Sequence, residues 1–232
     1  MLIFIDGIDG TGKSTLVTNL FDRILAEPVD RPVTTFPFPT RIPEGAEKAD
    51  PFSRTMFHLN DFHETMRNHK RLNDIRICDR SFITTMAYQG YNDTVGQELV
   101  NPRFHGIMSL GAEALLSTRN PSDMTDDKDV FFIYVKCDPE VASKRVLGRT
   151  TDRVDDIERV TDPKALTERL ATLQDRLELC YAHVRMNINV MFPQHRYYFY
   201  MVDSTDTGPD ALLEDVLQQV KQIGWPDQQS LV

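Results

Sequence analysis

Short apolar runs, rich in β-branched and aromatic residues, recur along the chain and predict β-strands. The five runs are Leu2–Asp6, Val33–Phe36, Ile75–Asp79, Val130–Lys136 and Tyr197–Asp203. Several of them are continuously hydrophobic, which is typical of parallel strands that are covered on both faces. Three of the runs end in an aspartate at the point where the chain must turn. The pattern therefore predicts a parallel sheet whose strand ends carry polar side chains.

Helical spacing occurs between and after these runs. One apolar stripe advances in steps of three and four residues and consists of Leu166, Leu170, Leu173, Leu177, Tyr181 and Val184. A second stripe, from Leu212 to Ile223, follows the start signal Gly208-Pro209. Strands that alternate with such helices predict a doubly wound α/β fold, with a five-stranded parallel sheet flanked by helices. At 232 residues the chain fits a single domain, residues 1–232.

Three segments carry no periodic signal. Residues 37–51 contain four prolines, and residues 120–129 are polar and acidic, so both are predicted to be surface loops. Residues 186–196 mix Asn, Met, Phe, Pro and His without a clear period and receive no assignment. The role of residues 186–200 is therefore left open.

The segment GIDGTGKS at residues 7–14 fits the pattern G-x-x-x-x-G-K-[ST] and lies between a predicted strand and a predicted helix. Its glycines let the backbone curl so that several N–H groups point at a phosphate, and the helix start adds its positive dipole end. Lys13 is expected to reach the transferred phosphoryl group, and Ser14 to bind Mg²⁺ through its hydroxyl. The residues expected to hold the nucleotide are Gly7, Ile8, Asp9, Gly10, Thr11, Gly12, Lys13, Ser14 and Thr15.

The composition narrows the range of functions. The formal net charge of −9 argues against general attraction to a nucleic-acid backbone but leaves small phosphorylated ligands open. No apolar run approaches the roughly 20 residues of a membrane span, and Asp6 and Asp9 interrupt the apolar start, so no signal peptide is expected. The three cysteines lack CxxC spacing, which argues against a disulfide framework and a zinc site. We expect a soluble, cytoplasmic protein that contacts neither membrane nor nucleic acid.

Several motifs together resemble the thymidylate kinase family of nucleoside monophosphate kinases. FIDGIDGTGKSTL at the N-terminus looks like that family's phosphate loop, TFPFP at residues 35–39 like its Phe-Pro loop, and CDRSFITTMAYQG at residues 78–90 like its Asp-Arg segment. CDPEVASKR at residues 137–145 and GRTTDRVDDIE at residues 148–158 are similar to the exit of its last strand and to its mobile lid. The resemblance implies ATP as the phosphoryl donor, Mg²⁺ as the metal and a fold of the P-loop NTPase type.

The Asp-Arg segment and the phosphate loop supply the first expected roles. Asp79, at the end of a predicted strand, would hold Mg²⁺ directly or through water, or else cap a helix. Arg80 would grip the acceptor monophosphate with its bidentate fork, or else form a surface ion pair. By resemblance, Asp9 contacts the acceptor's 3′-hydroxyl or orders the metal's water shell, with loop capping as the alternative. By resemblance, Tyr88 packs where a 2′-hydroxyl would lie and so favours deoxyribonucleotides, unless it is a core tyrosine.

The resemblance also places residues around the acceptor. Thr85 and Gln89 would face the base, and Phe36 lies in the Phe-Pro loop. After the Phe-Pro pair the family usually carries an arginine that touches the acceptor phosphate. This chain has Phe38 there, which leaves Arg41 as a substitute.

A second departure concerns the base itself. Phe57 matches the family's aromatic residue that stacks on thymine, but Asp61 stands four residues later, on the same helix face, where the family has an arginine. A carboxylate would repel the O4 acceptor of thymine and would suit an exocyclic amino group such as cytosine N4. The alternative is that Asp61 pairs with Arg54 or Arg80 and another group reads the base.

Phosphoryl transfer spreads negative charge over equatorial oxygens, which a mobile arginine can neutralise when substrates are bound. The lid, at about residues 146–160, offers Arg149 and Arg153, four positions apart. Because Gly10 occupies the third variable position of the phosphate loop, the chain resembles family members that supply the catalytic arginine from the lid. Arg145 is a further candidate. The alternative is a solvated charged segment, since acidic residues are interleaved with these arginines.

The expected function is an ATP-dependent deoxynucleoside monophosphate kinase, with dTMP as the leading acceptor and altered or broadened base choice left open. A deoxynucleoside kinase shares the phosphate loop and would use Asp79 as a base, although Ala87–Gly90 favours the monophosphate kinase. A nucleotide-binding module that switches a partner is the third alternative. One predicted helix either packs in the core or forms a homodimer contact, and its apolar residues are Phe104, Ile107, Met108, Leu110 and Leu115.

Overall fold

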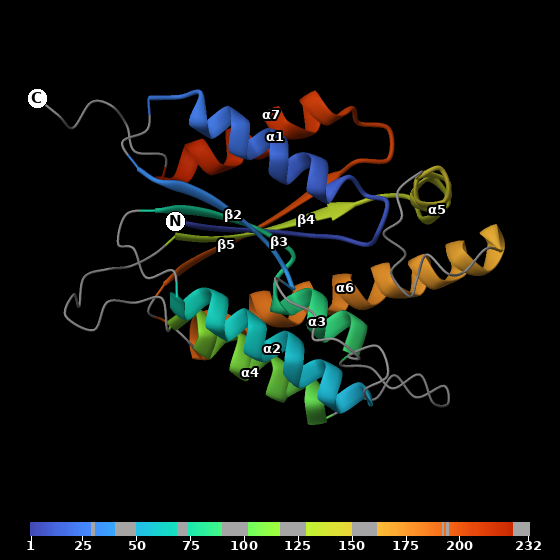
Figure 1. Cartoon of the computed structure of the whole chain (residues 1–232), viewed down its shortest axis with the longest axis horizontal. Coiled ribbons are helices and arrows are strands. Elements are labelled where there is room, and N and C mark those ends of the chain that lie inside the picture. The colour runs from blue at the N-terminus through green and yellow to red at the C-terminus, as the bar shows by residue number, and fades with distance from the viewer. Residues whose placement is uncertain are drawn as a thin grey trace, which may run out of the picture.

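The computed structural model describes residues 1–28, 31–39, 50–68, 74–89, 102–116, 129–149, 162–191, 193 and 195–224. The strands are β1 Leu2–Asp6, β2 Val33–Pro37, β3 Ile75–Asp79, β4 Asp129–Lys136 and β5 Arg196–Asp203. The helices of the described residues are α1 Lys13–Leu25, α2 Pro51–Asn68, α3 Phe82–Gln89, α4 Pro102–Leu116, α5 Pro139–Leu147, α6 Pro163–Met191 and α7 Pro209–Gly224. The predicted α/β fold with a five-stranded parallel sheet is confirmed (Figure 1).

The sheet has the strand order β2-β3-β1-β4-β5, and every pair of neighbouring strands is parallel. Strand β1 is central, with β3 on one side and β4 on the other. In an open parallel sheet, ligands bind outside the carboxyl ends of the strands, where the connections diverge to opposite sides. The loops that follow β1, β3, β4 and β5 all meet at that edge.

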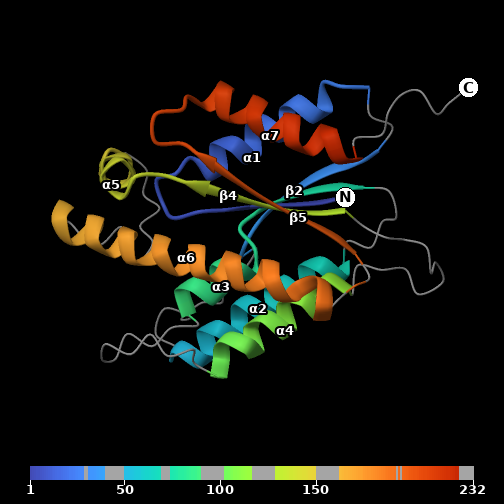
Figure 2. The same ribbon diagram turned by 180° about the vertical axis from the view of Figure 1, so that it is seen from behind.

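Helices cover both faces of the sheet. α1 and α7 lie on one face, and α2, α3, α4 and α6 lie on the other (Figures 1 and 2). Alternate residues of β1 therefore point into two separate hydrophobic clusters, with Ile3 and Ile5 beneath α1 and α7 and Leu2 and Phe4 on the opposite face. Phe4 stacks on Phe132 of β4, with 5.2 Å between the ring centroids. Burial on both faces explains why the strand sequences are continuously hydrophobic.

Helix α6 extends through Met191, so it includes residues of the segment that the sequence left unassigned. Met186 and Val190 lie on its outer side and are 70% and 82% exposed. Hydrophobic side chains on the solvent face conceal the helical period of residues 186–191. Of the predicted surface loops, Pro37 ends β2, Pro51 begins α2 and Asp129 begins β4, while residues 40–49 and 117–128 lie outside the described residues.

The helix predicted around Ile107 is α4. The sequence left open whether its apolar residues pack in the core or form a homodimer contact, and most of them pack in the core. Ile107, Met108 and Leu115 are buried, whereas Leu110 is 43% exposed and the side chain of Phe104 lies outside the described residues. A homodimer contact through this helix stays a prediction. None of the described helices is both long and apolar enough to cross a membrane.

Candidate active site

The loop between β1 and α1 has a backbone that requires glycine. Gly10 and Gly12 adopt φ values of 86° and 87°, a region that is sterically costly for residues with a Cβ atom. A Cβ on Gly7 would lie 2.5 Å from the carbonyl oxygen of Val135, and a Cβ on Gly10 would overlap the backbone of Ala142. Strand β4 and helix α5 thus press against the loop and fix its path.

The same loop leaves the start of α1 open to a ligand. Its N-cap residue is Gly12, which offers no side-chain cap, and the first turn of α1 contains no acidic residue. The first N–H groups of a helix have no intrahelical partner, and the helix dipole adds partial positive charge at this end. The loop and the helix start together form an anion site of the kind that holds phosphates.

Lys13, the first residue of α1, is buried within this site. Its Nζ donates a hydrogen bond of 2.7 Å to the carbonyl of Ile8 and lies 3.9 Å from Oδ1 of Asp9. Burial and the neighbouring charges of Arg80 and Arg149 lower the pKa of Lys13, against the opposing effect of Asp9. Burial has removed the water that would hydrate this ammonium. The negative charge of an anionic ligand at the loop would offset that loss.

Ser14 and Asp79 meet beside the loop. The hydroxyl of Ser14 donates to Oδ2 of Asp79 over 2.6 Å, while Oδ1 of Asp79 is buried without a hydrogen-bond partner among the described residues. A hydroxyl and a carboxylate with an unused oxygen are hard oxygen ligands, the type that Mg²⁺ prefers. These two residues therefore fit a magnesium ion, as the sequence predicts for them.

Asp9 lies at the centre of a charged cluster. Its Oδ1 accepts a 2.7 Å hydrogen bond from Nη2 of Arg80, and its Oδ2 lies 3.5 Å from the hydroxyl of Tyr88. The guanidinium of Arg80 is 5.6 Å from the centre of the Tyr88 ring, within range of a cation–π contact. Burial opposes the charge on Asp9, but Arg80, Lys13 and Arg149 outweigh it and hold the pKa of Asp9 below its usual value.

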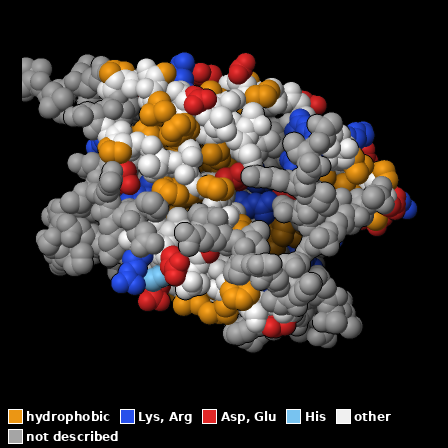
Figure 3. Space-filling model, in the orientation of Figure 1, with side chains coloured by type: hydrophobic (Ala, Val, Ile, Leu, Met, Phe, Trp, Pro, Cys, Tyr) orange, Lys and Arg blue, Asp and Glu red, His pale blue; other side chains and the backbone are white. Residues whose placement is uncertain are grey.

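Arg149 is exposed at the last described position before the predicted lid. Its charge acts on the pKa values of both Asp9 and Lys13, so it belongs to the same electrostatic site. Arg153, with the lid residues 150–160, lies outside the described residues. In the space-filling view, Lys and Arg side chains gather near the centre of the face shown, between the helices above and below the sheet (Figure 3).

The predicted base-facing residues occupy different environments. Phe57 and Asp61 lie one turn apart on α2, with Phe57 40% and Asp61 8% exposed. Thr85 is buried on α3, and Gln89, at the end of that helix, has a buried Oε1 without a partner among the described residues. Phe36, in β2, is half-buried against the cluster on the α2 side of the sheet. The roles of these residues around a base stay predictions.

Phe38, where the resembling family has an arginine, is a core residue. It is 7% exposed, and its ring packs edge-on against Phe62 with 5.2 Å between centroids. It contributes no polar group to the site. Arg41, the substitute named from the sequence, lies outside the described residues.

Asp61 belongs to a group of charges around His58. Burial and the positive charges of Arg80 and Arg54 lower the pKa of His58, while Asp61 acts in the opposite direction. Arg54, Arg80 and Asp61 therefore all lie within electrostatic range of His58. Both readings of Asp61, as the partner of an arginine and as a group that faces the base, stay predictions.

Arg145, a further candidate for the catalytic arginine, points away from the charged cluster. Its Nη2 donates to the carbonyls of Ser204 and Thr205 over 2.9 and 3.2 Å, and its Nη1 to the carbonyl of Gly10 over 3.5 Å. These bonds fasten α5 to the phosphate loop and to the turn after β5. With its donors directed at backbone carbonyls, Arg145 is better suited to lining a pocket than to reaching a transferred phosphoryl group.

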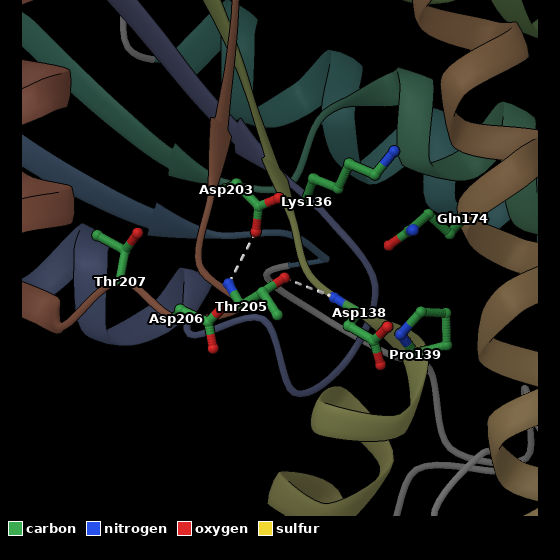
Figure 4. Close-up of a pocket in the computed structure, with 8 residues that line it drawn as sticks. All are labelled: Lys136, Asp138, Pro139, Gln174, Asp203, Thr205, Asp206 and Thr207. Carbon is green, nitrogen blue, oxygen red and sulfur yellow. Dashed lines mark hydrogen bonds between the residues drawn. The ribbon is translucent and has the colours of Figure 1, made fainter.

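Two pockets flank the turn that follows β5, a feature that the sequence reasoning missed. One, of about 450 Å³, lies beside the phosphate loop and is lined by Thr11, Gly12, Thr15, Leu16, Arg145, Ser204, Thr205, Asp206, Thr207, Gly208, Pro209 and Leu212. The other, of about 440 Å³, is shown in Figure 4. Between them, Thr205 donates its N–H to Asp203 and accepts from the N–H of Asp138 (Figure 4). The polar run after the last strand, at the ligand-binding edge, was the available signal.

A parallel sheet of this strand order, with a phosphate-binding loop after its central strand, is a fold of the P-loop kinase type. Residues 5–103 match the sequence model of the family described as Thymidylate kinase. The thymidylate kinase of Neorickettsia sennetsu (strain ATCC VR-367 / Miyayama) is 26% identical over 110 residues, which cover 43% of this chain and 55% of that relative. Over residues 5–103 the chain is therefore similar to the thymidylate kinase family, and its match spans about half the length of this curated relative.

Proposed function

We propose that this protein is an ATP-dependent deoxynucleoside monophosphate kinase that transfers the γ-phosphoryl group of ATP to the phosphate of an acceptor, with dTMP as the leading candidate. The observation that carries this proposal is the placement of two cations around one carboxylate. Arg80 lies 2.7 Å and Lys13 lies 3.9 Å from Oδ1 of Asp9. Lys13 belongs to the phosphate loop, whereas Arg80 follows a different strand.

Lys13 and Arg80 come from separate elements and meet at Asp9. Two cations placed in this way suit the phosphates of a donor and of an acceptor that lie end to end. Lys13 and the start of α1 would hold the donor's β- and γ-phosphates. Arg80 presents a planar fork that matches a phosphate bidentately, so it would hold the acceptor's monophosphate. A protein that binds a single nucleotide and transfers nothing would not need the second cation.

The donor's base has a candidate place in the pocket between Arg145 and the turn after β5. That pocket adjoins Thr11, Gly12 and Thr15 of the phosphate loop, so phosphates in the loop and a base in the pocket can belong to one nucleotide. The guanidinium of Arg145 is anchored by backbone carbonyls and offers a flat, fixed face on which a base can stack. Mostly apolar and polar uncharged groups line the remaining wall.

Ser14 and Asp79 would hold the Mg²⁺ that accompanies ATP. When bound, the metal neutralises charge on the phosphate oxygens and orients them for transfer. The same pair argues against the deoxynucleoside kinase alternative, in which Asp79 would remove a proton from a sugar hydroxyl. Asp79 accepts from Ser14 instead, which directs it toward the metal side of the loop.

The acceptor side favours a deoxyribonucleotide. Tyr88 reaches Asp9 with its hydroxyl and lies beneath Arg80, so its ring would border the acceptor's sugar. Phe57, Asp61, Thr85 and Gln89 would surround the base. Catalysis would consist mainly of positioning, which can lower a barrier by about 7 to 11 kcal/mol. Arg149, with Arg153, would neutralise the charge that develops during transfer.

The proposal is tested by ADP release from purified protein with ATP, Mg²⁺ and a panel of deoxy- and ribonucleoside monophosphates, with thymidine in parallel. Deoxynucleoside monophosphates should be phosphorylated and thymidine should not, and removal of Mg²⁺ with EDTA should stop turnover. Phosphorylation of thymidine in place of dTMP would establish the deoxynucleoside kinase alternative. ATP binding without any acceptor-dependent ADP release would indicate a nucleotide-binding module.

The base preference has its own expected result. If Asp61 faces the base, Asp61→Arg should shift kcat/KM toward dTMP and away from dCMP, by a combined factor of about 10² or more, because an unmatched polar group in a site is strongly rejected. The same panel of acceptors measures this ratio. Asp61→Asn is the matched control, because it keeps the size and removes the charge. An unchanged acceptor profile in Asp61→Arg would remove Asp61 from base recognition.

A further inference from the structure

A buried carboxylate that none of the proposed steps uses lies directly before the phosphate loop. Asp6, the last residue of β1, is completely buried. Its two oxygens accept four hydrogen bonds from residues that are far away in the sequence. Oδ1 accepts from the N–H of Ser81 and from the hydroxyl of Thr84, and Oδ2 accepts from the hydroxyls of Ser81 and Tyr181. These bonds join β1 to the start of α3 and to the middle of α6.

Four donors surround Asp6, and an ionised carboxylate can accept from all of them at once, because it only accepts hydrogen bonds. Burial nevertheless raises the pKa of Asp6 above its usual value, and the bonds from Ser81, Thr84 and Tyr181 act against that rise. Four bonds of 2.5 to 2.7 Å are an extensive set for one buried side chain, and removing the acceptor would leave all of them unmet.

The residue before Ser81 is Arg80, whose backbone is held in an unusual conformation. Its φ is 82°, in the left-handed region that residues with a Cβ atom seldom adopt. The N–H of Arg80 donates to the carbonyl of Ile5 over 2.9 Å, and the next N–H, that of Ser81, donates to Asp6 over 2.7 Å. The end of β1 thus fixes two consecutive N–H groups, one on each side of the Arg80 Cα atom.

We propose that Asp6 is a positioning residue that holds the backbone of Arg80, through Ser81, so that the Arg80 guanidinium lies against Asp9. The inference rests on the proposed function, in which Arg80 binds the acceptor phosphate. Asp6 touches neither substrate in this scheme. Its effect passes through the turn between β3 and α3, and it therefore concerns the acceptor site much more than the donor site.

Three variants separate this role from a merely structural one. Asp6→Ala removes the acceptor of all four bonds. Asp6→Asn is the conservative variant, because its carbonyl oxygen can face the N–H of Ser81 while its amide donates to the hydroxyls of Ser81 and Tyr181, which can turn to accept. Tyr181→Phe removes one bond of the same network on the α6 side and leaves the Ser81 bonds intact.

Asp6→Ala should lower kcat/KM for the acceptor by about 10²-fold, the effect expected when a positioning group shifts by an ångström. Its dissociation constant for an ATP analogue should stay within about threefold of the wild-type value. Asp6→Asn should recover most of the loss, and Tyr181→Phe should change the acceptor constants little. Equal losses for donor and acceptor in Asp6→Ala would overturn the proposal.

A double-mutant cycle gives the sharpest test in solution. In an Arg80→Ala background, Asp6→Ala should have little further effect on acceptor kcat/KM, because Asp6 acts through Arg80. If the loss of acceptor kcat/KM in the double variant were the product of the losses in the two single variants, Asp6 would act independently of Arg80. If Asp6→Ala does not yield folded protein, Asp6→Leu takes its place in the cycle with the same expected sign, because it also removes the acceptor of the Ser81 N–H and has the same branching as aspartate.

A crystal structure of Asp6→Ala, or of Asp6→Leu if the former does not fold, needs no turnover. It should show Arg80 outside the left-handed region, without its contact to Asp9. An unchanged Arg80 would refute the proposal, whichever acceptor the enzyme uses. Absence of monophosphate kinase activity in the wild-type protein would instead refute the proposed function, and the crystallographic result would still decide the role of Asp6.

Discussion

Replacing Lys13 by alanine should lower kcat by about 10³-fold, the effect expected when a preorganised charged donor at the reacting phosphate is lost. The ammonium is buried beside Asp9 and the backbone of the loop. The only other basic residue of α1 is Arg23, in the last turn, so no cation of this helix can take its place. The measurement is steady-state ADP release with saturating ATP and acceptor. Thermal unfolding in parallel separates a loss of chemistry from a loss of folding.

Lys221→Ala is the matched control for this prediction. Lys221 lies on α7, where its ammonium pairs with Glu27 at the surface. Removing an exposed ion pair of this kind should change stability by roughly 1 kcal/mol or less and leave kcat unchanged. Full activity of Lys13→Ala would mean that the loop does not handle the transferred phosphoryl group.

Gly10→Ala should strongly weaken binding of the donor nucleotide. The φ of 86° at Gly10 costs roughly 1 to 2 kcal/mol in any residue with a Cβ atom. The added methyl group would also overlap the backbone of Ala142, which cannot move aside like a flexible side chain. The loop must therefore change its path and lose the alignment of its N–H groups. Isothermal calorimetry with an ATP analogue should find affinity weakened by about 10²-fold or more.

Gly106→Ala is the control for this prediction, because it makes the same substitution at a glycine where a Cβ atom fits. Gly106 lies within α4, and a Cβ atom there would meet nothing within 4 Å. Alanine in a helix interior is more stable than glycine by roughly 0.5 to 1 kcal/mol, so this variant should melt at a higher temperature. If Gly10→Ala bound nucleotide as tightly as Gly106→Ala does, the loop would not be the donor site.

The sequence predicted the strands closely because a strand that is buried on both faces is a continuous run of hydrophobic residues. Leu2–Asp6 and Ile75–Asp79 were predicted with their observed bounds, and the other three strands differ by one residue at one end. The phosphate loop was also recognisable from the sequence, because its backbone geometry requires glycine at fixed positions. Helix α6 was recognised only where its buried stripe is regular, because Met186 and Val190 on its solvent face break the amphipathic pattern.

Contacts between distant segments were harder to foresee. Arg145 was named as a candidate for catalysis from its position near the lid, whereas its guanidinium is bound to the carbonyls of Ser204 and Thr205, about 60 residues away. No local pattern encodes that pairing. The four hydrogen bonds of Asp6 were hidden in the same way, because one of their donors, Tyr181, is 175 residues away in the sequence. Local sequence reveals which groups are polar, but the topology decides which of them meet.

Asp9 acts as a shared counter-ion for two sites in this chain. Because one carboxylate serves Lys13 and Arg80 together, an anion that draws either cation toward itself changes the electrostatic environment of the other. Thermodynamic linkage requires such an influence to be mutual, so each substrate should alter the affinity of its companion by the same factor.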